Sequence, residues 1–104
     1  MILTTIESIP DKKIVAHFGI VTGSTVRSKH FGRDLFAGLK NIIGGELKGY
    51  TELMEETRNE ATERMIAQAT KFGANAVVGI RFSTSDVAPG AAEVFAYGTA
   101  VKVE

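Results

Sequence analysis

The sequence contains no cysteine, which excludes disulfide bonds, thiolate metal sites and a cysteine nucleophile. It also has no excess charge of either sign, because twelve basic and twelve acidic residues give a formal net charge of zero. Without an overall field, the chain has no general attraction for a nucleic acid or an acidic membrane surface. It lacks both an apolar run near the ~20 residues of a membrane span and the charged and apolar regions of a secretory signal. We therefore expect a cytoplasmic protein with neither a nucleic acid nor a membrane as partner.

The chain has the length and composition of one small globular domain. Of its 104 residues, 44% are hydrophobic and 23% are charged. No internal repeat or linker is found, so we predict a single domain over residues 1–104. Five basic residues and no acid lie from Lys12 to Arg33, whereas six acids and two bases lie from Glu46 to Glu63. This asymmetry suits complementary surfaces on neighbouring copies of the chain, or two separately solvated faces.

A long amphipathic helix is predicted between Thr51 and Phe72. Thr51 can cap its N-terminus, and Gly73 can end it because glycine adopts the left-handed conformation without a steric penalty. The apolar face comprises Met54, Ala61, Met65, Ala69 and Phe72, with Tyr50 at its edge. The opposite face is acidic and comprises Glu52, Glu56, Glu60 and Glu63. One face is therefore expected to pack on a sheet and the other to be solvated.

Four strands and a second helix are predicted around the long helix. The strands are residues 1–7, 14–21, 76–84 and 93–103, and residues 32–43 have helical spacing. Alternation places Ala76, Val78 and Ile80 on one face, and residues 24–29 form either a polar loop or a short extension of the second strand. Glycine and alanine along one face of the last strand indicate that another backbone or a bulky side chain comes close. We predict a two-layer α+β domain, order ββααββ, with an antiparallel sheet covered by the long helix.

Four short motifs occur along the chain. They are Arg33-Asp34-Leu35-Phe36-Ala37, Gly44-Gly45-Glu46 before Tyr50, Arg64-Met65, and Gly73-Ala74-Asn75-Ala76-Val77-Val78-Gly79. In sequence and order they resemble the YbjQ family of small bacterial proteins, which are labelled as heavy-metal-binding. The resemblance spans nearly the whole chain. It implies a dodecin-like subunit that assembles with copies of itself into a ring, a homopentamer, and it implies no established activity.

The residues offer little support for a metal site within one subunit. Soft metals prefer thiolates, which are missing, and a closed zinc site needs about four ligands. The sequence has two histidines, His17 and His30, without the spacing of a shared site. In a ring, one histidine per subunit near the axis would present several imidazoles, with carboxylates such as Glu46 or Asp34 completing the set. The competing interpretation is a core or interface position for His17 and a surface position for His30.

Two arginines are candidates for ligand binding. Arg58 lies on the flank of the helix's apolar face, and Arg81 lies in an otherwise apolar strand. A guanidinium in such a place needs carboxylates, backbone carbonyls or an anion, because an unpaired buried charge is costly. Both residues therefore either form structural ion pairs or bind a small anionic ligand.

Three hypotheses follow for the function. The leading one is a self-assembling ring that binds a metal ion or a small anionic ligand at its subunit interfaces. The alternative is a structural or adaptor oligomer that engages an unidentified protein partner through the acidic helix face. An enzyme with a site between subunits has the least support, because the glycines form no phosphate-binding loop and no serine lies in a nucleophile motif.

Overall fold

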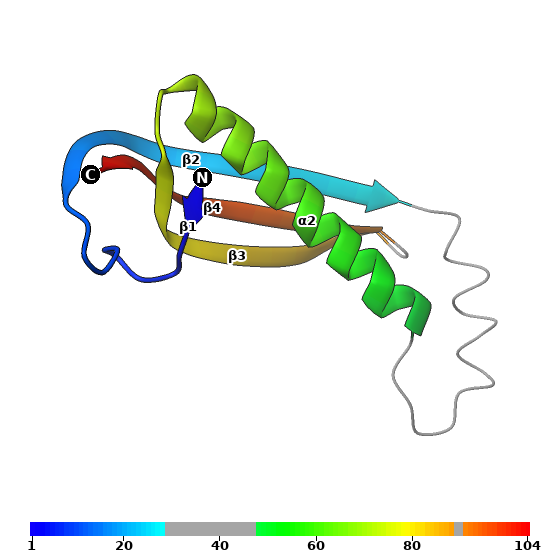
Figure 1. The fold of residues 1–104 in the computed structure, drawn as a ribbon. Coiled ribbons are helices and arrows are strands. Elements are labelled where there is room, and N and C mark those ends of the chain that lie inside the picture. The colour runs from blue at the N-terminus through cyan, green and yellow to red at the C-terminus, as the bar shows by residue number, and fades with distance from the viewer. Residues whose placement is uncertain (29–47, 89–90) are drawn as a thin grey trace.

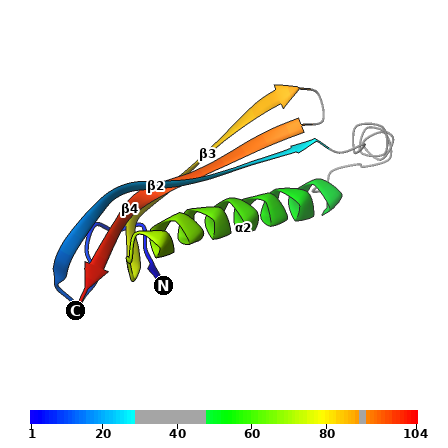
Figure 2. The ribbon, with the colours of Figure 1, turned by 90° about the horizontal axis from the view of Figure 1, so that it is seen from above.

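The fold is a four-stranded sheet with a long helix on one face (Figures 1 and 2). The computed structural model describes residues 1–28, 48–88 and 91–104. Its elements are β1 (Ile2–Leu3), β2 (Ile14–Ser28), α2 (Lys48–Lys71), β3 (Ala76–Ala88) and β4 (Ala91–Val103). The predicted helix at 32–43 lies outside the described residues. The described elements therefore run ββαββ, and the α+β class with two layers is confirmed.

The strands lie in the order β1-β3-β4-β2, so the central β4 separates β3 from β2. β4 is antiparallel to both neighbours, whereas the two-residue β1 runs parallel to β3. The prediction of an antiparallel sheet is therefore wrong at this edge, and the sheet is mixed. After β1, residues 4–13 cross from one edge of the sheet to the opposite edge, where β2 begins. β1 therefore does not form a hairpin with β2 and lies instead beside β3, which runs in the same direction.

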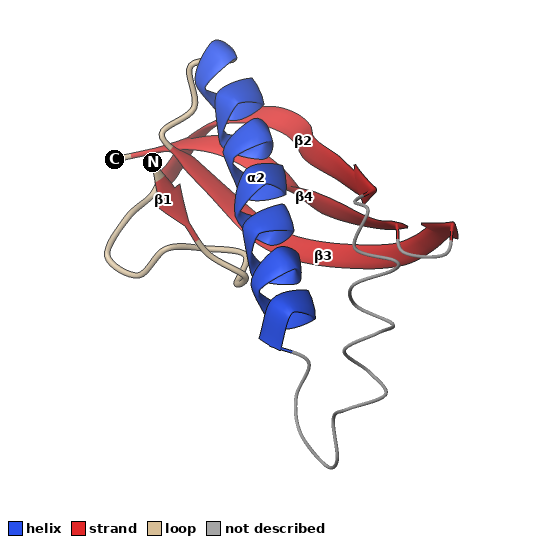
Figure 3. Cartoon of the chain, turned by 90° about the vertical axis from the view of Figure 1, so that its right-hand side faces the viewer, coloured by secondary structure: helices blue, strands red, loops and turns tan. Residues whose placement is uncertain are grey.

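The helix packs on β2 and β4 (Figure 3). Its buried side chains are Leu53, Thr57, Ala61, Met65 and Ala69. The closest approach is at Gly23 of β2, where a Cβ atom would lie 1.9 Å from the carbonyl oxygen of Ala61 and 2.6 Å from the amide nitrogen of Met65. A glycine is therefore required at this crossing, because only a bare backbone lets the helix lie so close.

The helix differs from its prediction at both ends. It begins at Lys48, so Thr51 lies inside it and is not its N-cap. Phe72 is 46% exposed and does not belong to the buried face. The termination at Gly73 is confirmed, since this glycine has φ of 86°, in the left-handed region. No helix in the described ranges has the length and apolar character needed to cross a membrane.

A bulge in β3 overturns the predicted alternation of its side chains. Gly79 has φ of 63°, and the register with β4 shifts between Val78 and Arg81. Ala76 and Val78 consequently join a small cluster on the face away from the helix, whereas Ile80 joins the core beneath it. One extra residue in a strand reverses the faces of every residue after it, which periodicity in the sequence cannot reveal.

The other two long strands extend further than predicted. Residues 24–28 continue β2, so the extension is confirmed and the loop is not. On β4, Ala96 and Ala100 are fully buried, and a Cβ atom at Gly98 would lie 2.7 Å from Cγ1 of Val77. The predicted close approach to the small face of this strand is therefore confirmed.

Candidate functional site

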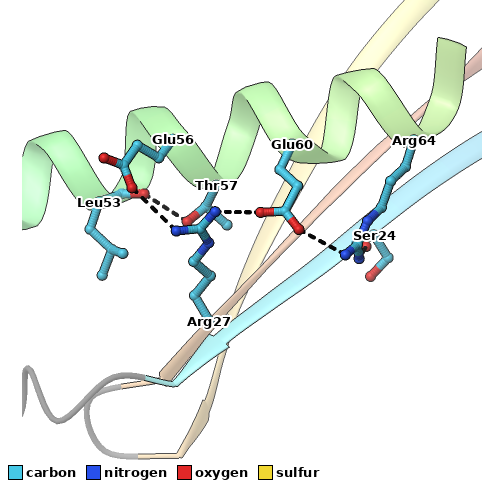
Figure 4. A network of polar contacts seen from close by, with 7 residues as sticks. All are labelled: Ser24, Arg27, Leu53, Glu56, Thr57, Glu60 and Arg64. Atoms are coloured by element: carbon cyan, nitrogen blue, oxygen red, sulfur yellow. Dashed lines mark hydrogen bonds and ion pairs between the residues drawn. The ribbon is translucent and has the colours of Figure 1, made fainter.

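The main polar cluster of the described residues joins β2 to α2 (Figure 4). Arg27 of β2 donates through Nη1 to Glu56 Oε2 at 3.2 Å and through Nη2 to Glu60 Oε2. Arg64 donates through Nη2 to Glu60 Oε1 at 2.7 Å and through Nη1 to the carbonyl oxygen of Ser24 at 2.6 Å. Both oxygens of Glu60 are thus engaged by guanidinium groups. The cluster fastens the C-terminal end of β2 to the helix.

The electrostatics of this cluster favour a structural role. The hydrogen bond from Arg27 lowers the pKa of Glu60, with further lowering by the charges of Arg27 and Arg64, while desolvation opposes the shift. The same hydrogen bond raises the pKa of Arg27. Glu60 is therefore a carboxylate at neutral pH whose two oxygens already have partners, so it is suited neither to donate a proton nor to bind a metal ion.

This cluster corrects the prediction that the acidic helix face is solvated along its whole length. Glu56 remains exposed, but it reaches Arg27, and the side chain of Glu60 is only 30% exposed. The i,i+4 spacing of Glu60 and Arg64 is visible in the sequence and could have predicted their ion pair. Arg27 gives no such signal, because it lies 33 positions before Glu60 and meets it only through the packing of β2 on α2.

Arg81 finds backbone carbonyls as partners. Its Nη1 donates to the carbonyl oxygens of Thr5 and Ile80, both at 2.8 Å. The residue is exposed, and the first of these bonds ties the N-terminal segment to β3. Part of the donor capacity of this exposed side chain is therefore used within the subunit.

The other candidate residues do not converge within one subunit. His17 is exposed on β2 opposite Val101 of β4, and Arg81 lies opposite Tyr97, four residues away along the same strand, which corresponds to about 13 Å. Arg58 is exposed on α2, which covers the other face of the sheet. His30 lies outside the described residues. The prediction of a buried position for His17 is therefore wrong for the subunit alone, and its interface alternative stays a prediction.

The described residues form no preformed metal site within one subunit. Within residues 1–28, 48–88 and 91–104, no three side chains of histidine, cysteine, aspartate or glutamate are grouped so that they could hold an ion. A site built from these residues would need contributions from more than one copy of the chain.

Comparisons with known proteins agree on the family and leave its activity open. The whole chain, residues 1–104, matches the YbjQ family, which carries the description "Putative heavy-metal-binding". A UPF0145 protein of Hahella chejuensis is 66% identical over 104 residues and covers 100% of both chains. Another, of Archaeoglobus fulgidus, is 52% identical over 99% of this chain and 95% of its own.

A solved structure supports the fold at low sequence identity. It is a crystal structure of a protein of unknown function from Pediococcus pentosaceus, assigned to the DUF74 family, with a TM-score of 0.61 and 16% identity over 100% of this chain and 98% of the other. At this identity the likeness concerns the fold alone. Together with the match over residues 1–104, these findings show that the chain belongs to the YbjQ family.

Proposed function

We propose that this protein is the subunit of a homo-oligomeric ring and that assembly builds a site for a metal ion or a small anionic ligand between subunits. The pentamer is the ring size that the family resemblance implies. The observation that carries the proposal is the apolar surface of the single chain, because a stable monomer would bury most of it.

Among the described residues, more large hydrophobic side chains are exposed than buried. Twelve are exposed, among them Ile20 at 75%, Val26 at 53% and Val87 at 52%. Sixteen hydrophobic residues are buried, but seven of these are alanines, which leaves nine larger ones. Burial of a large apolar side chain contributes about 1.5–3 kcal/mol, so exposure of this many favours association with further copies.

The shape of the subunit supports the same proposal. Its radius of gyration is 17.0 Å, and it extends 54 × 24 × 16 Å, whereas a compact domain of this length has a radius of gyration of about 13 Å. The excess arises from strands of thirteen to fifteen residues that project beyond the helix (Figure 2). Packing of several elongated subunits side by side restores the compactness that one subunit lacks.

The ligand part of the proposal follows from the distribution of the candidate residues. His17 and Arg81 are exposed but too far apart to share a ligand within one chain. Arg58 likewise has no ion pair among the described residues. A ring repeats each of them several times about one axis, which is how isolated histidines or arginines can form a complete set of ligands.

Native mass spectrometry of untagged protein, purified without chelator, tests both parts. We expect one defined oligomer that carries a metal ion or an added small-molecule mass, identified by elemental analysis of the same sample. The His17→Ala variant should keep the oligomer and lose the metal, while Lys102→Ala, an exposed control on β4, should keep both. A monomer would contradict the assembly, and a bare ring would contradict the ligand site.

A second candidate function is an adaptor that binds a protein partner through the acidic helix face. It is favoured by Glu52, Glu55 and Glu63, which are exposed and form no ion pair with other described residues. The double variant Glu52→Lys/Glu63→Lys should abolish capture of the partner, and Glu104→Lys, an exposed acid off the helix, should not. These positions spare the Arg27 cluster, so loss of capture would not reflect loss of the fold.

A further inference from the structure

The two outer edges of the sheet carry backbone groups that can be assigned from their hydrogen bonds. On β2, the amide of Thr22 donates to Oε1 of Gln68 at 2.7 Å, and the carbonyl oxygen of Ser24 accepts from Arg64 at 2.6 Å. Both partners are helix side chains, so these groups point away from β4. In an antiparallel pair this direction alternates along the strand. Even-numbered residues from 22 to 26 therefore present their N–H and C=O groups at the outer edge.

The outer edge of β3 follows the same rule after its bulge. The amide of Ile80 donates to the carbonyl oxygen of Thr4, at 3.1 Å, in the N-terminal segment beside this edge. Alternation then turns the N–H and C=O groups of Phe82, Thr84 and Asp86 outward. No described residue pairs with them, and every side chain from Arg81 to Ala88 is exposed. Among the described residues, this half-strand is held by β4 alone.

On the β2 edge the stretch from Thr22 to Val26, and on the β3 edge the stretch from Phe82 to Asp86, lie at the same height on the sheet. Val94 of β4 pairs with Thr25 on one side and Thr84 on the other, and Ala96 likewise pairs with Gly23 and Phe82. β2 and β3 are both antiparallel to β4, so they run parallel to each other. A copy moved sideways, without a shift along the strands, would therefore bring residues 22–26 of its β2 beside residues 82–86 of β3.

We propose that the edge of β3 from Phe82 to Asp86 pairs with the edge of β2 from Thr22 to Val26 in a second copy of this chain. The inference rests on the ring proposed above and specifies its interface. In a parallel pair, an outward residue on one strand bonds the two residues that flank its opposite number. With Thr84 opposite Thr25, its N–H donates to the carbonyl of Ser24 and its C=O accepts from the amide of Val26. The Ser24 carbonyl oxygen, which already accepts from Arg64, has a second lone pair for this bond.

The hydrogen-bonding phase and the side-chain directions agree at this unshifted register. Thr84 must lie opposite an odd-numbered residue of β2 for the outward groups to meet, and Thr25 is such a residue. Both side chains also lie on the helix face of the sheet, because each pairs with Val94, which belongs to the core beneath the helix. A shift by one residue would break both matches, whereas the unshifted register satisfies them together.

The charged side chains and the helix side chains that already bond the β2 edge are compatible with this pairing. The free half of β3 carries Asp86 on its helix face, since Asp86 pairs with Ala92 opposite Arg27. In the proposed register Asp86 would lie opposite Arg27 of the next copy, because both residues pair with Ala92 of their own β4. Gln68 can keep its bond to the Thr22 amide. The β3 residue at that height lies near Ile80, whose edge is already covered by Thr4.

Pairing of two different edges is a contact between unlike surfaces of the subunit. A contact between unlike surfaces generates a ring when no translation accompanies the rotation, and a helical filament when it does. Because residues 22–26 and 82–86 lie at the same height, neighbouring copies are not shifted along the strand direction. In a ring closed by this contact, each subunit would donate β2 to one neighbour and β3 to the other.

Cysteine pairs can test this interface in a chain that has no cysteine of its own. Ser24 and Ser83 both pair with Phe95 and lie on the same face, two strand spacings or about 10 Å apart within one chain. A disulfide needs Cα atoms within about 7 Å, so a bond between these positions must join two copies. In the proposed interface they lie one strand spacing apart.

The experiment is mild oxidation of Ser24→Cys/Ser83→Cys, followed by a denaturing gel and native mass spectrometry of the same sample. We expect a ladder of linked chains that ends at the native oligomer size. Each single variant alone should stay unlinked, and a mixture of the two single variants should link into dimers and no further. Ser24→Cys/Ser85→Cys serves as a second pair, displaced by two residues on the same face.

The outcomes separate this inference from the proposed function. Dimers from Ser83→Cys alone would show that β3 pairs with itself, which overturns the inference. A native ring without links in either double variant would show assembly through other surfaces, which overturns the inference and leaves the proposed function standing. A native monomer without links would overturn both.

Discussion

The two outer edges of this sheet are treated in opposite ways by the rest of the subunit. The β2 edge lies under the helix, where Gly23 meets the helix backbone and Gln68, Arg64 and Arg27 tie strand to helix. The β3 edge beyond Arg81 has a neighbour only in β4 among the described residues. Exposed strand edges promote association, and proteins usually cover or interrupt them. The subunit's own helix therefore caps two backbone groups of the β2 edge, at Thr22 and Ser24, whereas the end of β3 has no such cap among the described residues.

The largest difference between the edges should appear at Gly23 and Phe82, which face each other across Ala96. Gly23→Ala should lower the free energy of unfolding by about 3 kcal/mol or more, because the added Cβ meets backbone atoms that cannot move aside. Phe82→Ala removes a side chain that is already 46% exposed and should cost less than about 1 kcal/mol in the dissociated subunit.

Urea denaturation at several protein concentrations measures both effects. A loss for Phe82→Ala that grows with protein concentration would locate this side chain in an interface between copies. Normal stability of Gly23→Ala would contradict the close crossing of β2 and α2.

A smaller difference is expected at Thr25 and Thr84, which pair with Val94 from its two sides. Thr25 is 2% exposed, and its hydroxyl oxygen has no hydrogen-bond partner in the part of the chain that the structure describes. Thr25→Val should therefore stabilise the protein by about 1 kcal/mol, because it removes a buried unpaired polar group. Thr84→Val changes an exposed side chain and should shift stability by less than about 0.5 kcal/mol. Thermal unfolding of the two variants provides the measurement, and destabilisation by Thr25→Val would indicate that its hydroxyl has a partner.

The smallest effect concerns the pH dependence of the Arg27–Glu60 pair. Because the native pKa of Glu60 is lowered, its ionised form stabilises the fold. This contribution is complete above the ordinary glutamate value of 4.5 and disappears as the pH falls through the lowered native pKa. The stability difference between wild type and Glu60→Gln should therefore be seen at pH 6 and vanish at lower pH. Urea titrations across this range, with Glu63→Gln as an exposed control, measure it, and a constant difference would contradict the lowered pKa.

The sequence predicted those parts of the fold that depend on local pattern. The long helix, its end at Gly73 and the small face of the last strand all follow from residue type and spacing, and all are present. The predictions were wrong where a single residue interrupted the alternation of a strand or where the helix started earlier than its pattern indicated. The bulge at Gly79 moved Ile80 to the other face of the sheet, and the helix began at Lys48 without the predicted cap at Thr51.

The candidate site was less predictable, because its residues meet only through tertiary packing. His17, Arg58 and Arg81 stand out in the sequence because their neighbours are apolar, yet all three are exposed in the subunit. The residues that do converge are Arg27, Glu60 and Arg64, which come from a strand and a helix far apart in the sequence. Spacing along one helix can suggest an ion pair, but no local pattern reveals which strand will lie beside it.

By itself, the sequence determined the class of the domain, its long helix and its family, because these depend on periodicity and on motifs that are contiguous in the chain. Only the tertiary structure decided which edge strand the helix would pack on and cap with its side chains. That choice depends on the register of β2 against β4 and on the close approach at Gly23. Both arise from contacts between distant segments, whose geometry is fixed only when the sheet and the helix pack together.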